Sequence, residues 1–150
     1  MASKGILFLF SESKDLDYER LAQLDSRMAR HYYDLPATML SVNSKITGNR
    51  TFRWEDNNTE VLQWNNFNRC FAFELSPYDE TLLLDVDYII QNNNLLGYFG
   101  SCHDFICHNR SWDITGNNVF RHDAFLSKNN FEMRWATVVY FKKNNFTKNF

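Results

Sequence analysis

The sequence predicts an α/β fold in which a Rossmann-like, mainly parallel sheet carries helices on both faces. Three short apolar segments support this prediction, at residues 6–10, 37–42 and 81–84, with helical or loop material between them. Apolar runs of this length are typical of strands that are buried on both faces of a parallel sheet. We therefore expect these three strands to be adjacent and buried.

A helix is predicted between the first two strands. Apolar side chains repeat at helical spacing at Leu21, Leu24, Met28 and Tyr32. Acidic residues precede this stripe and Arg27 and Arg30 stand near its end, which is the order that the helix dipole favours. Pro36 disfavours helix at Leu35, so a strand is expected from residue 37 onward. Strand, helix and strand in this order open a wound α/β sheet.

The remainder of the chain gives weaker signals. Residues 43–68 fit either a hairpin or an extended loop, and residues 71–75 fit a helical turn or a short strand. Residues 76–79 have the composition of a turn. The polar, glycine-containing stretch 92–118 is expected to consist mainly of loops, and residues 135–141 are predicted to form a final buried strand.

Length and composition favour a single domain spanning residues 1–150. The chain has 150 residues, of which 44% are hydrophobic and 17% aromatic, enough for a core and too many for a disordered chain. Its formal net charge of -2 gives no general attraction to nucleic acid or to an anionic membrane. Recognition of phosphate must therefore be local, and no nucleic-acid polymer is expected as a partner.

The sequence contains no stretch that approaches the length of a membrane span. The apolar residues 5–10 are shorter than a signal-peptide core and are followed at once by polar residues. The three cysteines are too few for a disulfide scaffold in a protein without an export signal. We expect a cytoplasmic protein.

Asp85 and Asp87 form the motif that points most directly to chemistry. Side chains alternate along a strand, so both carboxylates would point the same way, with Cα atoms roughly 6.6 Å apart. They follow the third predicted strand, where open α/β sheets generally bind ligands. Mg²⁺ typically takes one or two carboxylates together with phosphate oxygens, so the pair is predicted to hold Mn²⁺ or Mg²⁺ against a diphosphate. Two solvated aspartates at the end of a strand would produce the same tripeptide.

Three segments carry a family resemblance: residues 17–22 (DYERLA), 35–40 (LPATML) and 75–87 (LSPYDETLLLDVD). In order and spacing they resemble GT-A glycosyltransferases, the superfamily of nucleotide-diphospho-sugar transferases, and especially the glycosyltransferase-like proteins of tailed phages. In that family a helix with a Tyr-x-x-Leu-Ala pattern is followed by a strand with Leu-Pro. An element of the form Pro-Tyr-x-x-Thr-Leu-x-Leu-Asp-x-Asp comes next. The similarity extends through residues 112–116 and 133–141 and so covers most of the chain.

The resemblance implies a metal-dependent glycosyltransferase that transfers a sugar from a nucleoside-diphosphate sugar to an unknown acceptor. It makes Asp87 the main metal ligand and Asp85 a second ligand that also faces the ribose or a metal-bound water. It places the base and ribose beside the residues that end the first strand, Phe10, Ser11 and Glu12. Tyr18 is a further substrate-binding candidate and equally a packing residue. If the chain is phage-encoded, the host cytoplasm is its expected location.

The chain also departs from the pattern of the family. Members of the fold often have an acidic residue after the second strand, whereas residues 41–43 here are Ser, Val and Asn. Full enzymes of this fold continue with helices and loops that contact the acceptor, so the chain is expected to be an incomplete GT-A domain. Catalytic groups are not assigned, since Asp113 and Asp123 fit equally well as solvated loop carboxylates.

Two other functions remain open from the sequence. Aromatic rings pack on sugars and amides hydrogen-bond to hydroxyl groups, so this aromatic- and Asn-rich chain would also suit a catalytically inactive module that binds a nucleotide sugar or a glycan. A nucleotidyltransferase would share the wound sheet and the need for metal-bound phosphate. Release of nucleoside diphosphate separates an active transferase from an inactive module.

A cluster of Cys and His residues lies in the predicted loop region. Cys102-His103 and Cys107-His108 lack the ligand separations of structural zinc sites. We interpret the segment as a loop near the donor site, in which His103, Asp104 or His108 would contact phosphate or sugar. His108 is the substrate-binding candidate that we select from these.

Overall fold

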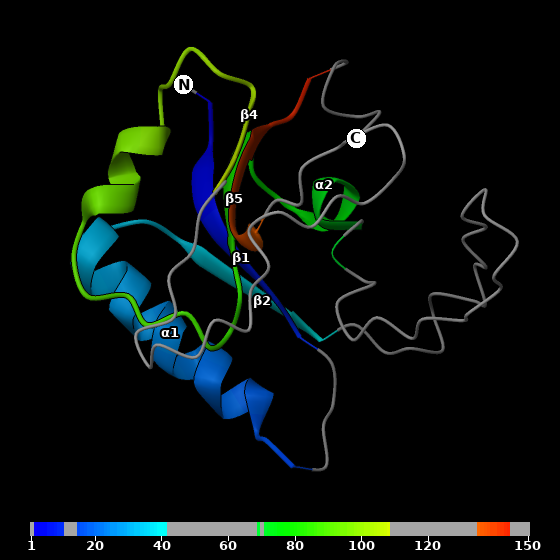
Figure 1. Ribbon diagram of the computed structural model, residues 1–150, viewed down its shortest axis with the longest axis vertical. Helices are drawn as coiled ribbons and strands as arrows, with labels where there is room; N and C mark the ends of the chain where they lie inside the picture. The colour runs from blue at the N-terminus through cyan, green and yellow to red at the C-terminus, as the bar shows by residue number, and fades with distance from the viewer. Residues whose placement is uncertain (1, 11–14, 42–68, 70, 109–134, 145–150) are drawn as a thin grey trace, which may run out of the picture.

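The computed structural model describes residues 2–10, 15–41, 69, 71–108 and 135–144. These residues form an α/β structure with one five-stranded sheet, a long helix and shorter helical segments (Figure 1). In chain order the elements are β1 (Lys4–Phe10), α1 (Tyr18–Tyr33), β2 (Ala37–Ser41), α2 (Ala72–Leu75), β3 (Glu80–Leu84), the 3₁₀ helix η2 (Asn94–Tyr98), β4 (Phe105–His108) and β5 (Trp135–Lys142).

The sheet is mixed. Its strand order is β2-β1-β3-β5-β4, and β1 pairs in parallel with both β2 and β3. β5 runs antiparallel to its two neighbours, β3 and β4. The prediction that the first three strands are adjacent is confirmed. The expectation of a mainly parallel sheet holds for that half only, because β5 returns in the opposite direction.

Burial differs between the first three strands. All five residues of β3 are buried, and Ile6, Leu7 and Phe8 of β1 are 0% exposed. β2 lies at the edge of the sheet and is only half-buried, with Met39 39% exposed. The expectation that this second strand is buried is therefore wrong, because an edge strand has a neighbour on one side only.

The predicted strand-helix-strand unit is confirmed, and polar caps define its helix. The carboxylate of Asp17 accepts a hydrogen bond from the backbone N–H of Arg20 at 3.0 Å, satisfying one donor of the first turn. The helix ends at Asp34, whose backbone is left-handed with φ 52°. The carbonyl of Pro36 then accepts a hydrogen bond from the N–H of Ile6 at 3.0 Å, which begins the pairing of β2 with β1.

The buried side of α1 is turned by one residue from the predicted stripe, of which Met28 and Tyr32 still pack against the core. The helix buries Ala22, Asp25, Ala29 and Tyr33. These positions lie one residue beyond the predicted stripe, and Leu24, a member of that stripe, is 54% exposed. The two alanines are 0% exposed, and their small side chains let the helix backbone approach the sheet closely.

Helical elements cover both faces of the sheet. On one face, residues of α1 and η2 pack in one cluster with Ile6, Phe8, Leu82 and Leu84. On the other face, Ala72 of α2 packs with Leu7, Leu83, Val139 and Phe141. The expectation of mainly loops over residues 92–118 is wrong in its described part, because both η2 and β4 lie there and Leu95 is buried in the first cluster.

Among the described residues, no helix combines the length and the apolar character that crossing a membrane requires.

Candidate functional site

The register of the sheet brings the ends of four strands to one edge, which we call the carboxyl edge. β1, β2 and β3 are parallel, with Phe10 beside Ser41 and Phe8 beside Leu84. β4 runs in the same direction as β3, because both are antiparallel to β5. His108 at the end of β4 therefore lies at the same edge as Phe10 and as the residues that follow β3.

Asp85 is the first residue beyond β3, and it is held by backbone hydrogen bonds. Its N–H donates to the carbonyl of Thr137 at 3.1 Å, and its own carbonyl accepts from the N–H of Tyr88 at 3.1 Å. The predicted pair therefore lies on a turn, whereas the sequence interpretation placed it on an extended strand. Val86 is buried, Asp85 is half-buried and Asp87 is exposed.

Arg69 is a site residue that the sequence analysis missed. Its Nη1 forms an ion pair with Oδ1 of Asp85, and the two side chains are only 14% and 25% exposed. Burial lowers the pKa of Arg69 to about 10, and the negative charge of Asp87 opposes this lowering. Arg69 is therefore charged at neutral pH. It precedes the acidic pair by a stretch with no clear local pattern, which is why nothing in the sequence indicated it.

Asp25 is a second residue that was missed. It lies on the buried side of α1 and is 6% exposed. Burial, and then repulsion from Asp87, raise the pKa of Asp25 to about 6. In Figure 1 the segment that follows β3 runs across α1 on its way to η2, and Val86 of this segment packs in one cluster with Ala22 and Ala29. The helix therefore contributes a third acidic side chain close to the pair.

The residues present at this edge fit a metal ion that is shared with a phosphate ligand. No three His, Cys, Asp or Glu side chains within the described ranges come together as a metal-binding group. Mg²⁺ does not need such a cage, since it is commonly bound by one or two carboxylates, water and substrate phosphate oxygens. The exposed Asp87, next to the half-buried Asp85, provides that minimal set.

Phe10 and Tyr18, two of the predicted substrate contacts, are both half-buried and pack against the cluster beneath α1. Much of the surface of each ring is therefore covered by the core. Ser11 and Glu12, and the candidate acids Asp113 and Asp123, lie outside the described residues. Residues 42–43 and 112–116, which were compared with the GT-A pattern, also lie outside the described residues.

His108 lies at the carboxyl edge, but its ring is held by a neighbour. Its Nε2 shares a hydrogen bond of 2.7 Å with the hydroxyl of Tyr98 in η2, and the two rings meet edge to face. His103 and Asp104 precede β4 and lie at the opposite edge, where the carbonyl of Asp104 accepts from the N–H of Lys142 at 2.9 Å. Cys107 and His108 lie at the end of β4, whereas Cys102 and His103 precede its start, which argues against a shared zinc ion.

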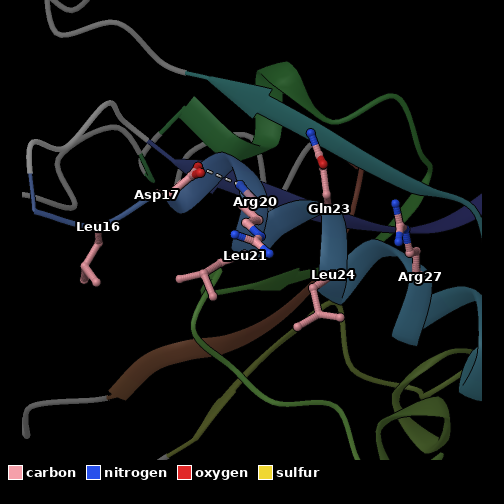
Figure 2. A pocket seen from close by; sticks show the side chains of 7 residues that line it. All are labelled: Leu16, Asp17, Arg20, Leu21, Gln23, Leu24 and Arg27. Carbon is pink, nitrogen blue, oxygen red and sulfur yellow. Dashed lines mark hydrogen bonds between the residues drawn. The ribbon is translucent and has the colours of Figure 1, made fainter.

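A groove on the outside of α1 is a separate surface feature (Figure 2). It is lined by Leu16, Asp17, Arg20, Leu21, Gln23, Leu24 and Arg27. Figure 2 shows the three leucine side chains pointing to one side, with Gln23 and Arg27 directed to the other. All of its residues come from α1 and the two positions before it, so the groove contains neither acid of the pair.

No protein-family model, no curated protein and no solved structure matches this chain. The likeness to GT-A glycosyltransferases therefore remains an expectation from the sequence.

Proposed function

We propose that this chain binds a nucleoside-diphosphate sugar at the carboxyl edge of its sheet and, with Mn²⁺ or Mg²⁺ held by Asp87 and Asp85, transfers the sugar to an acceptor. The observation that carries the proposal is that both carboxylates directly follow β3, a buried central strand, and that Arg69 pairs with the first of them.

The sheet topology supports a ligand site at this position. From β1 the chain passes through α1 to β2 on one side, and it later returns to β3 on the other side of β1. The change of direction makes the space beyond the carboxyl ends of β1 and β3 a topological switch point. Open α/β sheets generally bind their ligands in such a crevice. Asp85 and Phe10 are the residues that follow and end these two strands.

The charges of the site support a diphosphate leaving group. Breaking the bond between sugar and phosphate builds negative charge on the departing diphosphate. A bound divalent cation would stabilise this charge as a Lewis acid. Asp87 is exposed and would bind the cation, whereas Asp85 is oriented by its ion pair with Arg69 and by its backbone bond to Thr137. Phe10 and Tyr18 would border the space in which the nucleotide lies.

Release of nucleoside diphosphate from UDP-, GDP- and other nucleotide sugars, with and without Mn²⁺, tests this function. We expect slow release with water as the acceptor, which a chelator stops. Asp87→Asn should lower turnover by orders of magnitude, because the cation loses its exposed ligand. Glu74→Gln, an exposed substitution on α2, is the matched control and should leave turnover unchanged.

The alternative, an inactive binding module, predicts a different result in the same assay. Such a module would bind the nucleotide in a cation-dependent manner and release no diphosphate from any sugar donor. A protein that neither binds nucleotide with cation nor turns it over would contradict both versions.

A further inference from the structure

The guanidinium of Arg69 is only partly used by the protein. Nη1 pairs with Asp85, whereas Nε and Nη2 are buried and have no hydrogen-bond partner in the part of the chain that the structure describes. A buried donor without a partner destabilises the folded protein, and more so when it is charged. Two such donors on one side chain indicate a place where a ligand completes the hydrogen bonding.

The two unpartnered donors form a single recognition edge. In a planar guanidinium, the N–H of Nε and one N–H of Nη2 point in the same direction, side by side. This edge matches two oxygens of a phosphate or a carboxylate, and the resulting bidentate contact is among the strongest that proteins make. The Asp85 contact at Nη1 restrains the guanidinium, whose other edge is buried and has no hydrogen-bond partner among the described residues.

We propose that Arg69 is a binding residue for the diphosphate, which it contacts through Nε and Nη2 while Asp85 holds it through Nη1. This inference deepens the proposed function and rests on it. Arg69 would contact the same diphosphate that Asp85 and Asp87 bind through the cation.

The charges around Arg69 set the order of binding. The acidic side chains of Asp85, Asp87 and Asp25 outnumber the single positive charge of Arg69, so the site alone repels a diphosphate. A divalent cation offsets this excess of negative charge. Diphosphate therefore binds measurably only when the cation is present, and Arg69 adds affinity for the anion without contributing to the binding of the cation.

Calorimetric titration with inorganic diphosphate, in the presence and absence of Mg²⁺, tests these statements directly. Arg69→Lys keeps a positive charge beside Asp85 but lacks the two-donor edge. It should bind Mg²⁺ as the parent does and bind diphosphate about tenfold to a hundredfold more weakly, the effect of losing a hydrogen bond to a charged group. Arg30→Lys, an exposed change on α1, is the matched control and should behave as the parent.

A second measurement does not depend on how a variant folds. In ¹H-¹⁵N spectra of the parent protein, the Nε–H signal of Arg69 should move downfield when Mg²⁺ and diphosphate are added together. Equal diphosphate affinity in the parent and Arg69→Lys, or an Nε–H signal that does not move on binding, would overturn the role of Arg69 and leave the proposed function standing. A parent protein that binds no diphosphate with Mg²⁺ would overturn both.

Discussion

The ring of Tyr78 lies against the backbone of Gly5. A Cβ built on Gly5 would stand 2.3 Å from the nearest ring atom, far inside van der Waals contact. Tyr78 belongs to the turn before β3, and its hydroxyl is 2.8 Å from Oγ1 of Thr38 in β2. The tyrosine thus spans β1, and only glycine leaves room for it.

Gly5→Ala should destabilise the protein because the added methyl group forces the ring of Tyr78 to move. Overpacking of this kind costs about 1–3 kcal/mol in the free energy of unfolding. Urea denaturation measures it. Gly97→Ala is the control, since a Cβ there has nothing within 4 Å. Equal stability of Gly5→Ala and the parent would show that Tyr78 does not occupy this position.

Glu80 at the start of β3 should stabilise the protein in its ionised form. Burial by itself would raise the pKa of Glu80, but hydrogen bonds from the Tyr140 hydroxyl at 2.6 Å and the Gly100 N–H at 2.9 Å, with Lys4 nearby, lower it below its ordinary value of 4.5. Its contribution is therefore present above pH 4.5 and is lost as the pH falls through the lowered pKa.

Glu80→Gln removes this ionised acceptor. It should lower the free energy of unfolding by about 1–2 kcal/mol at pH 7, the difference between a charged and a neutral hydrogen bond, and by much less near pH 3. Denaturation at the two pH values gives the comparison. A loss that is the same at both would mean that the charge of Glu80 contributes nothing.

Asp25 should act in the opposite sense. Its pKa is raised from 3.8 to about 6, first by burial and then by Asp87, so the folded protein holds its proton more tightly than the unfolded chain. The free energy of unfolding therefore falls as the pH rises from 3.8 through about 6. Without divalent cations, Asp25→Asn should raise the free energy of unfolding at pH 7 by on the order of 1–3 kcal/mol.

The gain from Asp25→Asn should disappear near and below about pH 3, where both the folded and the unfolded carboxyl are protonated. Glu19→Gln, an exposed change on the same helix, should shift the stability by less than about 0.5 kcal/mol at either pH. A loss of stability at pH 7 in Asp25→Asn would mean that the buried carboxylate has an ionic partner that outweighs its desolvation.

The outline of the fold could be predicted because β1, α1, β2, β3 and β5 each have a local pattern. β3 ends in three consecutive leucines, and α1 has charges that complement its dipole and an aspartate cap. The buried side of α1 could not be chosen correctly, since hydrophobicity favours leucine over alanine, whereas close packing on the sheet selected the alanines. η2 (NLLGY) and β4 (FICH) were missed because apolar runs this short, set in a longer polar stretch, do not identify an element without its tertiary contacts.

The candidate site divides in the same way. Asp85 and Asp87 could be identified because they follow an apolar strand directly in the sequence, and position after a strand is a local property. Arg69 and Asp25 approach them only through folding, from a segment without a pattern and from the inside of a helix. No spacing rule connects either residue to the pair, so the charge balance of the site could be described only from the structure.

Asp87 should control the stabilisation of the protein by cation and nucleotide. A ligand that binds only the folded state adds RT ln(1 + [L]/Kd) to the free energy of unfolding, about 2.7 kcal/mol at a hundredfold excess over Kd. Mn²⁺ or Mg²⁺ together with a nucleoside diphosphate should therefore raise the Tm of the parent. The cation alone or the nucleotide alone should give a smaller rise. Asp87→Asn should abolish the shift while leaving the Tm of the ligand-free protein nearly unchanged, because the side chain is exposed.

The control for Asp87→Asn is Asp34→Asn, an exposed aspartate at the left-handed C-cap of α1, where asparagine is equally well tolerated. It lies at the far end of the helix from its cap at Asp17 and should keep the full ligand-dependent shift. Calorimetry with Mn²⁺ and UDP or GDP on the parent, Asp87→Asn and Asp34→Asn then shows whether Asp87 binds the cation. If Asp87→Asn and the parent bind the nucleotide with the same metal-dependent affinity, the cation is held by residues other than Asp87.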